Sequence, residues 1–148
     1  NQMIIPVDET NLFQAAIIHS LSWQDSHLSF CSPDFVELHT PEHQQKYMEE
    51  KRNNGSRFFM LVKHKPVGIV SVTGSLIEDL YIRPDEQNKG YGTELLQFAV
   101  KTCTDTPTLW ILENNTEAAR LYHRMGFRET GRINAITDEL NEIELSPK

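Results

Sequence analysis

The chain reads Ile77-Glu78-Asp79-Leu80-Tyr81-Ile82, stops at Arg83-Pro84, and continues through Gln87-Asn88-Lys89-Gly90-Tyr91-Gly92 into a helical pattern from Thr93 to Lys101. This order predicts a strand, a glycine turn and a helix N-terminus that meet at one place. The first N–H groups of a helix lack intrahelical partners and the helix dipole adds partial positive charge, so such a turn can hold a phosphate group. Gly90 and Gly92 let a ligand approach the backbone, although a plain turn before a helix uses glycine as well.

A second motif lies one helix and one strand further along. Leu109-Trp110-Ile111-Leu112 predicts a strand, Asn114-Asn115 precedes a helical segment from Thr116 to Met125, and Gly126-Phe127 ends that segment and begins a new strand. Together, Gln87-x-x-Gly90-x-Gly92 and Asn115-x-x-Ala118-x-x-x-Tyr122-x-x-x-Gly126-Phe127 resemble the GNAT superfamily of acyl-CoA-dependent N-acyltransferases in order and separation. The resemblance covers Phe58 to Phe127 well and the first 57 residues only loosely.

The composition is typical of one globular domain, which we expect to span residues 1–148. Only Cys31 and Cys103 are present, so neither a disulfide framework nor a four-ligand zinc site is indicated, and reduced thiols in a cytoplasmic protein are expected. No apolar run approaches the roughly 18 residues of a membrane helix, and no signal peptide is recognisable. No spacing of histidines and carboxylates indicates a metal site.

The net charge is −7, without a dense cluster of lysines and arginines. This composition disfavours nucleic acid as a partner, whereas an acidic surface attracts a cationic amine. An anionic cofactor stays compatible with it, because Arg83, Lys89 and the amides around Gly90 form a local positive focus.

The remaining pattern predicts two helices before a meander of three strands, followed by alternating helices and strands. The predicted helices run from a cap at Asp8 or Thr10 to about Trp23, and from Thr40-Pro41 to Asn53-Asn54-Gly55. The predicted strands are Met3 to Val7, Arg57 to Lys63, Pro66 to Thr73, Leu76 to Ile82, Thr108 to Leu112, Phe127 to Arg132 and Glu142 to Leu145, with a helix from Tyr91 to Cys103. The fold class is therefore α+β. The resemblance implies a three-layer α/β/α-like GNAT fold, with a mixed, mostly antiparallel central sheet, helices on both faces and a splayed strand pair.

The resemblance implies that acetyl-CoA is the co-substrate. Backbone N–H groups from Asn88 to Thr93 would then cradle the pyrophosphate, and Lys89 would add charge or remain a solvated loop lysine. The pantetheine arm would add to the edge of the strand Leu80 to Ile82, where the Leu80 N–H would stabilise the oxyanion that forms from the thioester oxygen. The implied cofactor-binding residues are Leu80, Tyr81, Ile82, Gln87, Asn88, Lys89, Gly90, Tyr91, Gly92, Thr93, Asn115 and Tyr122.

Tyr122 is the general acid that the resemblance implies, acting on the leaving thiol. Full proton transfer from an ordinary phenol to a thiolate is uphill by roughly 2 kcal/mol, so we expect hydrogen-bond stabilisation of the sulfur at least. A half-buried core tyrosine is the structural alternative. Asn115 and Asn114 compete to cap the helix, and Asn115 is free for pantetheine if Asn114 is the cap.

The acceptor amine must lose a proton, which costs about 4 kcal/mol for a lysine-like amine at neutral pH. Glu78 is the candidate base, placed two residues before Leu80 and expected on the same face of the strand, although a solvated acid is equally compatible. His19 and Trp23 share a helix face where the family builds a wall of the acceptor site; an aromatic core anchor beside a surface histidine is the alternative.

The function that the resemblance implies is acetyl transfer from acetyl-CoA to a primary amine of a small molecule or peptide, by direct attack in a ternary complex. A non-catalytic acyl-CoA-binding sensor is the alternative, and a nucleotide-binding domain is disfavoured because the glycine turn lacks a Gly-Lys-Ser/Thr ending. The expected partners are acetyl-CoA and an amine acceptor. A homodimer is compatible with the sequence.

Overall fold

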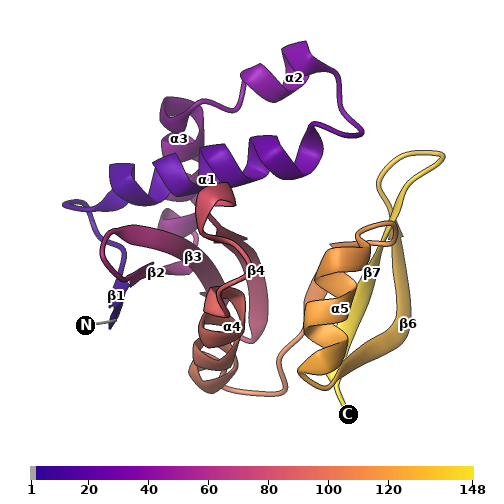
Figure 1. Ribbon diagram of the computed structural model, residues 1–148. Coiled ribbons are helices and arrows are strands. Elements are labelled where there is room, and N and C mark those ends of the chain that lie inside the picture. Colours follow the sequence, from indigo (N-terminus) through magenta and orange to yellow (C-terminus); the bar gives the residue numbers. More distant parts are fainter. Residues whose placement is uncertain (1–2) are drawn as a thin grey trace.

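The computed structural model describes residues 3–148 and contains two antiparallel sheets that lie side by side (Figure 1). The first sheet has the strand order β1-β2-β3-β4, made of β1 (Met3–Pro6), β2 (Arg57–Val62), β3 (Pro66–Thr73) and β4 (Leu76–Ile82). The second has the order β5-β7-β6, made of β5 (Leu109–Leu112), β6 (Phe127–Ala135) and β7 (Asn141–Pro147).

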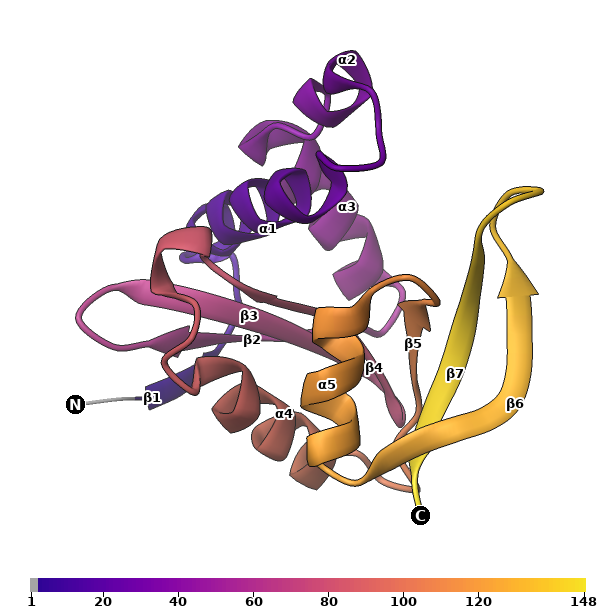
Figure 2. The same cartoon turned by 45° about the vertical axis from the view of Figure 1, so that its right-hand side comes forward.

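Helices cover both faces of the first sheet (Figure 2). Helices α1 (Leu12–His27) and α3 (Pro41–Asn53) lie on one face, and α4 (Tyr91–Thr102) lies on the other. Met60 and Ile69 therefore belong to a buried cluster with α1, whereas Leu61 and Val70 pack in a cluster with α4. This alternation follows from the two-residue period of a strand that is buried on both sides. Helix α5 (Thr116–Arg124) packs beside β6 in the second half.

The two sheets meet at a single parallel bridge between Leu76 of β4 and Thr108, just before β5. The Ile77 N–H donates to the Thr108 carbonyl at 2.9 Å, and the Thr108 N–H donates to the Ser75 carbonyl at 2.9 Å. Across residues 3–148 no other pairing joins β4 to β5, so the strands diverge beyond the bridge. This is the expected splayed pair, and it leaves one edge of β4 unpaired.

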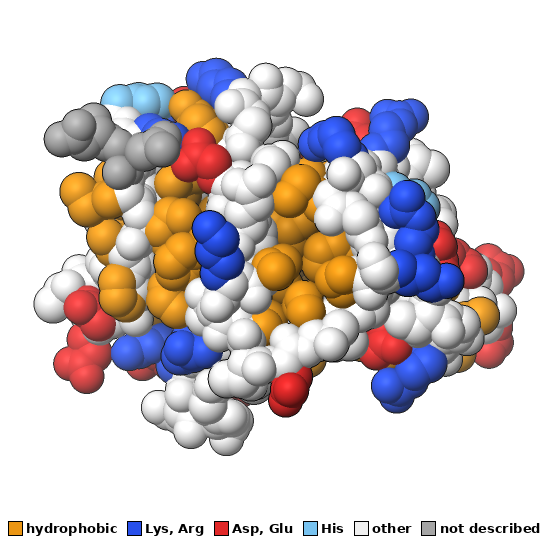
Figure 3. All heavy atoms as spheres, turned by 90° about the horizontal axis from the view of Figure 1, so that it is seen from below, with side chains coloured by type: hydrophobic (Ala, Val, Ile, Leu, Met, Phe, Trp, Pro, Cys, Tyr) orange, Lys and Arg blue, Asp and Glu red, His pale blue; other side chains and the backbone are white. Residues whose placement is uncertain are grey.

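On the face seen from below, apolar side chains reach the surface in the middle, while charged side chains lie mostly toward the edges (Figure 3). Among the helices of residues 3–148, none combines the length and the apolar character needed to cross a membrane.

Most predicted elements are confirmed. Strands β3 and β4 have the predicted bounds, and α3 begins as predicted, with the Thr40 Oγ1 accepting from the His43 N–H at 3.1 Å. In the second half, the order of helices and strands is as predicted, and β6 continues to Ala135 rather than ending at Arg132.

Two predictions near the N-terminus are wrong. Helix α1 begins at Leu12 and runs to His27, without a cap from Asp8 or Thr10, because the Asp8 carboxylate instead accepts from the Thr10 N–H at 2.8 Å in a local turn. Three helices, not two, lie between β1 and β2, since the expected link contains the short α2 (Pro33–Glu37). Its signal is Ser32 before Pro33, and the Ser32 Oγ caps the Phe35 N–H at 3.3 Å.

Candidate active site

A groove of about 1110 Å³ runs between the diverging strands β4 and β5, from the start of α4 to α5 and the C-terminal end of α1. The groove lies along the edge of β4 that pairs with no other strand. All but one of the predicted cofactor-binding residues line it; Lys89 is the exception. Tyr122 and Asn115 both line this groove.

The glycine turn at the start of α4 presents unused backbone donors. Within the described part of the chain, no N–H group from Asn88 to Thr93 donates a hydrogen bond to the protein. Gly90 occupies the N-cap position with φ +83°, and a Cβ built there would meet nothing within 4 Å, so the space in front of the turn is open. Unpaired amides, an open approach and a helix N-terminus together fit a diphosphate.

The lysine of this turn is tied to a neighbouring acid. The Lys89 Nζ lies 3.0 Å from Glu86 Oε1, and the Glu86 carboxylate also lies within 3.5 Å of His64 and Lys65. Arg83 is similarly paired with Asp85 at 3.1 Å. The local cations therefore neutralise local acids, and the backbone amides are the groups left for an anion.

Tyr122 projects from α5 into the core beside the groove, with only 8% of its surface exposed. Its hydroxyl has no hydrogen-bond partner among residues 3–148, yet the oxygen is not fully enclosed, so it opens onto the groove. Burial raises the pKa of the Tyr122 phenol, and the hydroxyl therefore stays protonated in neutral and mildly alkaline solution. This favours hydrogen-bond donation over full proton transfer, because the site does not lower the pKa of the phenol.

Asn115, not Asn114, caps α5. The Asn115 Oδ1 accepts from the Ala118 N–H at 3.1 Å, so of the two candidate caps Asn115 takes this role, and its side chain is not free in the way that a cap at Asn114 would leave it. The reason is that the helix begins at Thr116, which places Asn115 at the N-cap position. The Asn115 side chain keeps its amide NH₂ as the group that could reach a ligand in the groove.

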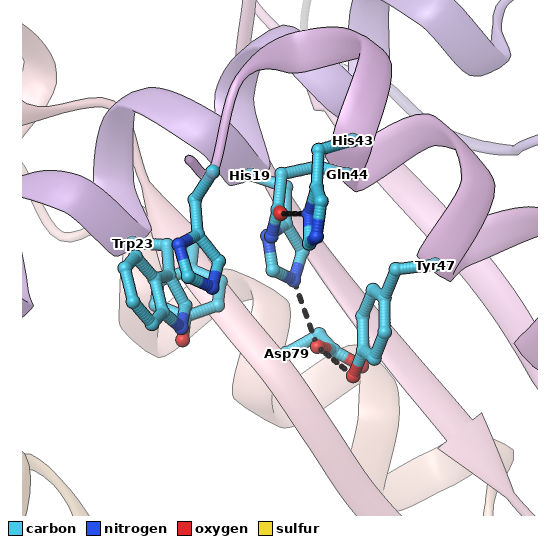
Figure 4. Close-up of a pocket in the computed structure, with 8 residues that line it drawn as sticks. His19, Trp23, His43, Gln44, Tyr47 and Asp79 are labelled. Carbon is cyan, nitrogen blue, oxygen red and sulfur yellow. Dashed lines mark hydrogen bonds and ion pairs between the residues drawn. The ribbon is translucent and has the colours of Figure 1, made fainter. Parts of the chain in front are cut away.

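A second, smaller pocket of about 190 Å³ lies between α1, α3 and β4 (Figure 4). We call it the Asp79 pocket; it is lined by His19, Trp23, His39, His43, Gln44, Tyr47, Asp79 and Tyr81. Asp79 and Tyr81 line the groove as well, so the two spaces meet at the residues that flank Leu80. His19 and Trp23 both line this pocket, and His19 is buried, so the alternative of a surface histidine is wrong, whereas their role as a wall of an acceptor site stays a prediction.

Asp79 is the centre of this pocket, and sequence reasoning missed it. Its φ of +52° marks a bulge in β4, where the pairing with β3 slips between Ile69 and Ser71. One carboxylate oxygen accepts from His19 Nε2 and the Tyr47 hydroxyl, both at 2.9 Å. The other accepts from Lys51 Nζ at 2.7 Å and the Ser71 hydroxyl at 2.8 Å. Four donors satisfy this buried anion.

These partners decide the protonation of Asp79. Burial alone would raise its pKa, but the hydrogen bond from His19 and the charge and hydrogen bond of Lys51 hold the pKa well below its ordinary value. The same anion acts on its neighbour: burial, followed by the Asp79 charge, raises the pKa of Tyr47. Asp79 is therefore a fixed carboxylate that does not accept protons near neutral pH.

The prediction that Glu78 and Leu80 share a face of the strand is wrong. Leu80 packs with the core cluster that contains α4, whereas the Glu78 carboxylate accepts from Lys51 of α3 at 2.8 Å on the other side. The bulge at Asp79 breaks the alternation that the prediction assumed. Glu78 is thus an acid paired with a lysine, and Lys51 and Asp79 are residues whose meeting no local pattern indicates.

Aromatic rings close the far end of the Asp79 pocket. The indole of Trp23 is stacked between two imidazoles, with ring centroids 3.8 Å from His27 and 3.5 Å from His39. Desolvation lowers the pKa of both histidines. Within residues 3–148, no group of three or more histidine, cysteine or acidic side chains is arranged to hold a metal ion.

Comparison with known proteins agrees with this geometry. The model of the Acetyltransferase (GNAT) family matches residues 21–127. The chain belongs to the GNAT family. Its fold is that of GNAT proteins: the solution structure of apo YjaB from Escherichia coli superposes with a TM-score of 0.70 at 21% identity, covering 99% of this chain and 97% of that one. The PaiA N-acetyltransferase of Thermoplasma acidophilum, crystallised with coenzyme A, superposes with a TM-score of 0.73 at 16% identity and covers 97% and 98% of the two chains.

One relative gives a more specific name. A segment of 68 residues is 38% identical to the peptidyl-lysine N-acetyltransferase YjaB of Salmonella typhimurium. This match covers 46% of this GNAT chain and 46% of the relative, so it spans about half the length of each protein.

Proposed function

We propose that this GNAT protein transfers an acetyl group from acetyl-CoA to a primary amine, and that the amine is the side chain of a lysine in a peptide or protein. The observation that carries the proposal is the row of unpaired amides from Asn88 to Thr93, which opens into the groove that also contains the Tyr122 hydroxyl. The lysine acceptor is supported by the name of the Salmonella relative.

Different groups of the groove would have different roles in such a reaction. The amides around Gly90 would hold the pyrophosphate of acetyl-CoA, which supplies the activated thioester, and the unpaired edge of β4 from Leu80 to Ile82 would align its amide-bearing arm. The Leu80 N–H would stabilise negative charge on the thioester oxygen. The protonated Tyr122 would donate a hydrogen bond to the departing sulfur.

The proposal is tested by following free thiol while the protein is incubated with acetyl-CoA and three acceptors. These are a lysine peptide with a blocked N-terminus, the same peptide with its lysine already acetylated, and a panel of small amines. We expect thiol release and acetylated product with the first peptide and none above background with the second. Release with small amines alone would contradict the lysine acceptor, and coenzyme A binding without any release would establish a sensor instead.

A further inference from the structure

Four side chains form one hydrogen-bonded chain across the Asp79 pocket, from the surface of α3 to the bulge of β4 (Figure 4). His43 Nδ1 lies 2.7 Å from Gln44 Oε1, Gln44 Nε2 lies 2.8 Å from His19 Nδ1, and His19 Nε2 lies 2.9 Å from Asp79 Oδ1. Gln44 and His19 are only 3% and 2% exposed, so the middle of this chain is fixed in the core.

The direction of these hydrogen bonds sets the tautomers. The Asp79 carboxylate only accepts, so His19 carries its proton on Nε2 and accepts from the Gln44 amide at Nδ1. The Gln44 oxygen then faces His43, whose proton must be on Nδ1. His43 Nε2 is left with a bare lone pair, and among the described residues it has no hydrogen-bond partner.

Other groups in the pocket are poor proton acceptors. Asp79 is satisfied by four donors, and Glu78 is paired with Lys51. His39 also has a bare Nε2, because its Nδ1 lies 3.1 Å from the Phe35 carbonyl, but its ring is stacked on Trp23 and burial lowers its pKa. Its ring centroid is 5.0 Å from that of His43, and a charge on His43 further lowers the pKa of His39.

We propose that the Asp79 pocket receives the acceptor amine and that His43 Nε2 is the base that takes its proton, with Gln44, His19 and Asp79 as positioning residues. This inference rests on the proposed acetyl transfer. As the amine nitrogen forms the new C–N bond, its proton passes to His43 Nε2 directly or through one water, and the C–S bond breaks with its electron pair on sulfur. The pocket meets the groove on both sides of Leu80, where this transfer must occur.

The electrostatic reason lies at the far end of the hydrogen-bonded chain. A proton on His43 strengthens the hydrogen bond from its Nδ1 to the Gln44 oxygen. The next two hydrogen bonds, from Gln44 to His19 and from His19 to Asp79, have the same direction and end at the permanent negative charge of Asp79, which favours a positive charge at the other end. A base that is oriented by a second group, which is oriented in turn by a carboxylate, is a general arrangement for accepting protons during nucleophilic attack. The groups that face His43 are His19 from α1, His39 from the α2–α3 link, Tyr47 from α3, and Asp79 and Tyr81 from β4.

The kinetic test compares His43→Ala with His123→Ala, which alters a surface histidine paired with Glu129 outside both spaces. For His43→Ala we expect kcat to fall about 100-fold, within the range of general base catalysis, while coenzyme A affinity is unchanged. The decrease of kcat toward acid pH should disappear in this variant, and imidazole added to the buffer should restore part of kcat. The assignment would be overturned if kcat were unchanged, if its decrease toward acid pH remained, or if imidazole did not restore any of the lost kcat.

A spectroscopic test needs no turnover. Imidazole ¹⁵N resonances of the free protein should show His43 as the Nδ1–H tautomer and His19 as the Nε2–H tautomer. An Nε2–H tautomer at His43, or a doubly protonated His19, would overturn the proposed relay. If none of the tested acceptors led the wild-type protein to release thiol, the proposed function would fail, while the ¹⁵N measurement would still test the tautomer assignment. If the wild-type protein were active and His43→Ala did not change kcat, only this inference would fail.

Discussion

The groove follows the unpaired edge of β4 and the Asp79 pocket lies on the face of β4 that α1 and α3 cover, and the two spaces offer different kinds of groups. The groove offers backbone amides from Asn88 to Thr93 that have no partner in the described residues, whereas the Asp79 pocket consists of side chains already hydrogen-bonded to one another. Backbone donors fit the diphosphate shared by all acyl-CoA ligands. The side-chain network of the Asp79 pocket suits its proposed role of receiving and deprotonating the acceptor.

The buried charges of the Asp79 pocket should dominate stability. Asp79→Asn leaves Lys51 with only the exposed Glu78, so the free energy of unfolding should fall by about 3 kcal/mol at pH 7. Chemical denaturation measures this loss. Glu78→Gln is the matched control, because it removes the exposed partner of the same lysine and should cost less than about 1 kcal/mol. Equal losses would show that burial does not distinguish the two acids.

The same variant has a defined pH dependence. The pKa of Asp79 is lowered in the folded protein, so its contribution to stability is present above the unfolded value of about 3.9 and is lost as the pH falls toward the folded value. The stability gap between wild type and Asp79→Asn should therefore narrow below about pH 4.

Gly90→Val tests the role of the backbone amides that the groove offers. Valine is strained at φ +83° and its methyl groups would enter the open space before the amides, so coenzyme A affinity measured by calorimetry should fall about 100-fold. Gly131→Val carries similar strain at φ +97° on β6, away from the turn, and should destabilise the protein without changing this affinity. Retained affinity in Gly90→Val would place the diphosphate elsewhere.

Tyr122→Phe should affect turnover rather than binding. Loss of the hydroxyl removes the proposed donor to the leaving sulfur, so kcat should fall roughly 10–100-fold while the KM for acetyl-CoA changes little. Because burial raises the pKa of Tyr122, the wild-type rate should show no alkaline loss from phenol ionisation below pH 10. A kcat equal to that of the wild type would remove Tyr122 from the chemistry.

The smallest effect is expected at the cap of α5. Asn115→Ala removes the acceptor for the Ala118 N–H and should lower the free energy of unfolding by about 1 kcal/mol. Asn114→Ala should leave the melting temperature unchanged, since Asn115 holds the cap position. A rise in the KM for acetyl-CoA in Asn115→Ala alone would add a contact with the ligand to its capping role.

The sequence by itself determined the parts of the protein that depend on interactions between residues close together in the chain. The strand, glycine turn and helix around Gly90, the meander from Arg57 to Ile82 and the helix containing Tyr122 are fixed by turn residues, caps and periodicity within short windows. The turn proposed to hold the diphosphate could be predicted because its donors are backbone groups of one continuous segment.

Only the tertiary structure decided the other side of β4. His19, the α3 residues Gln44 and Lys51, and Asp79 come from three distant segments of the chain, and a bulge at Asp79 reverses the face on which Glu78 was expected. A strand pattern assumes strict alternation, so it cannot show this bulge, at which a buried carboxylate meets donors from three other elements. The Asp79 pocket therefore depends on contacts between residues distant in the chain, which local propensity does not define.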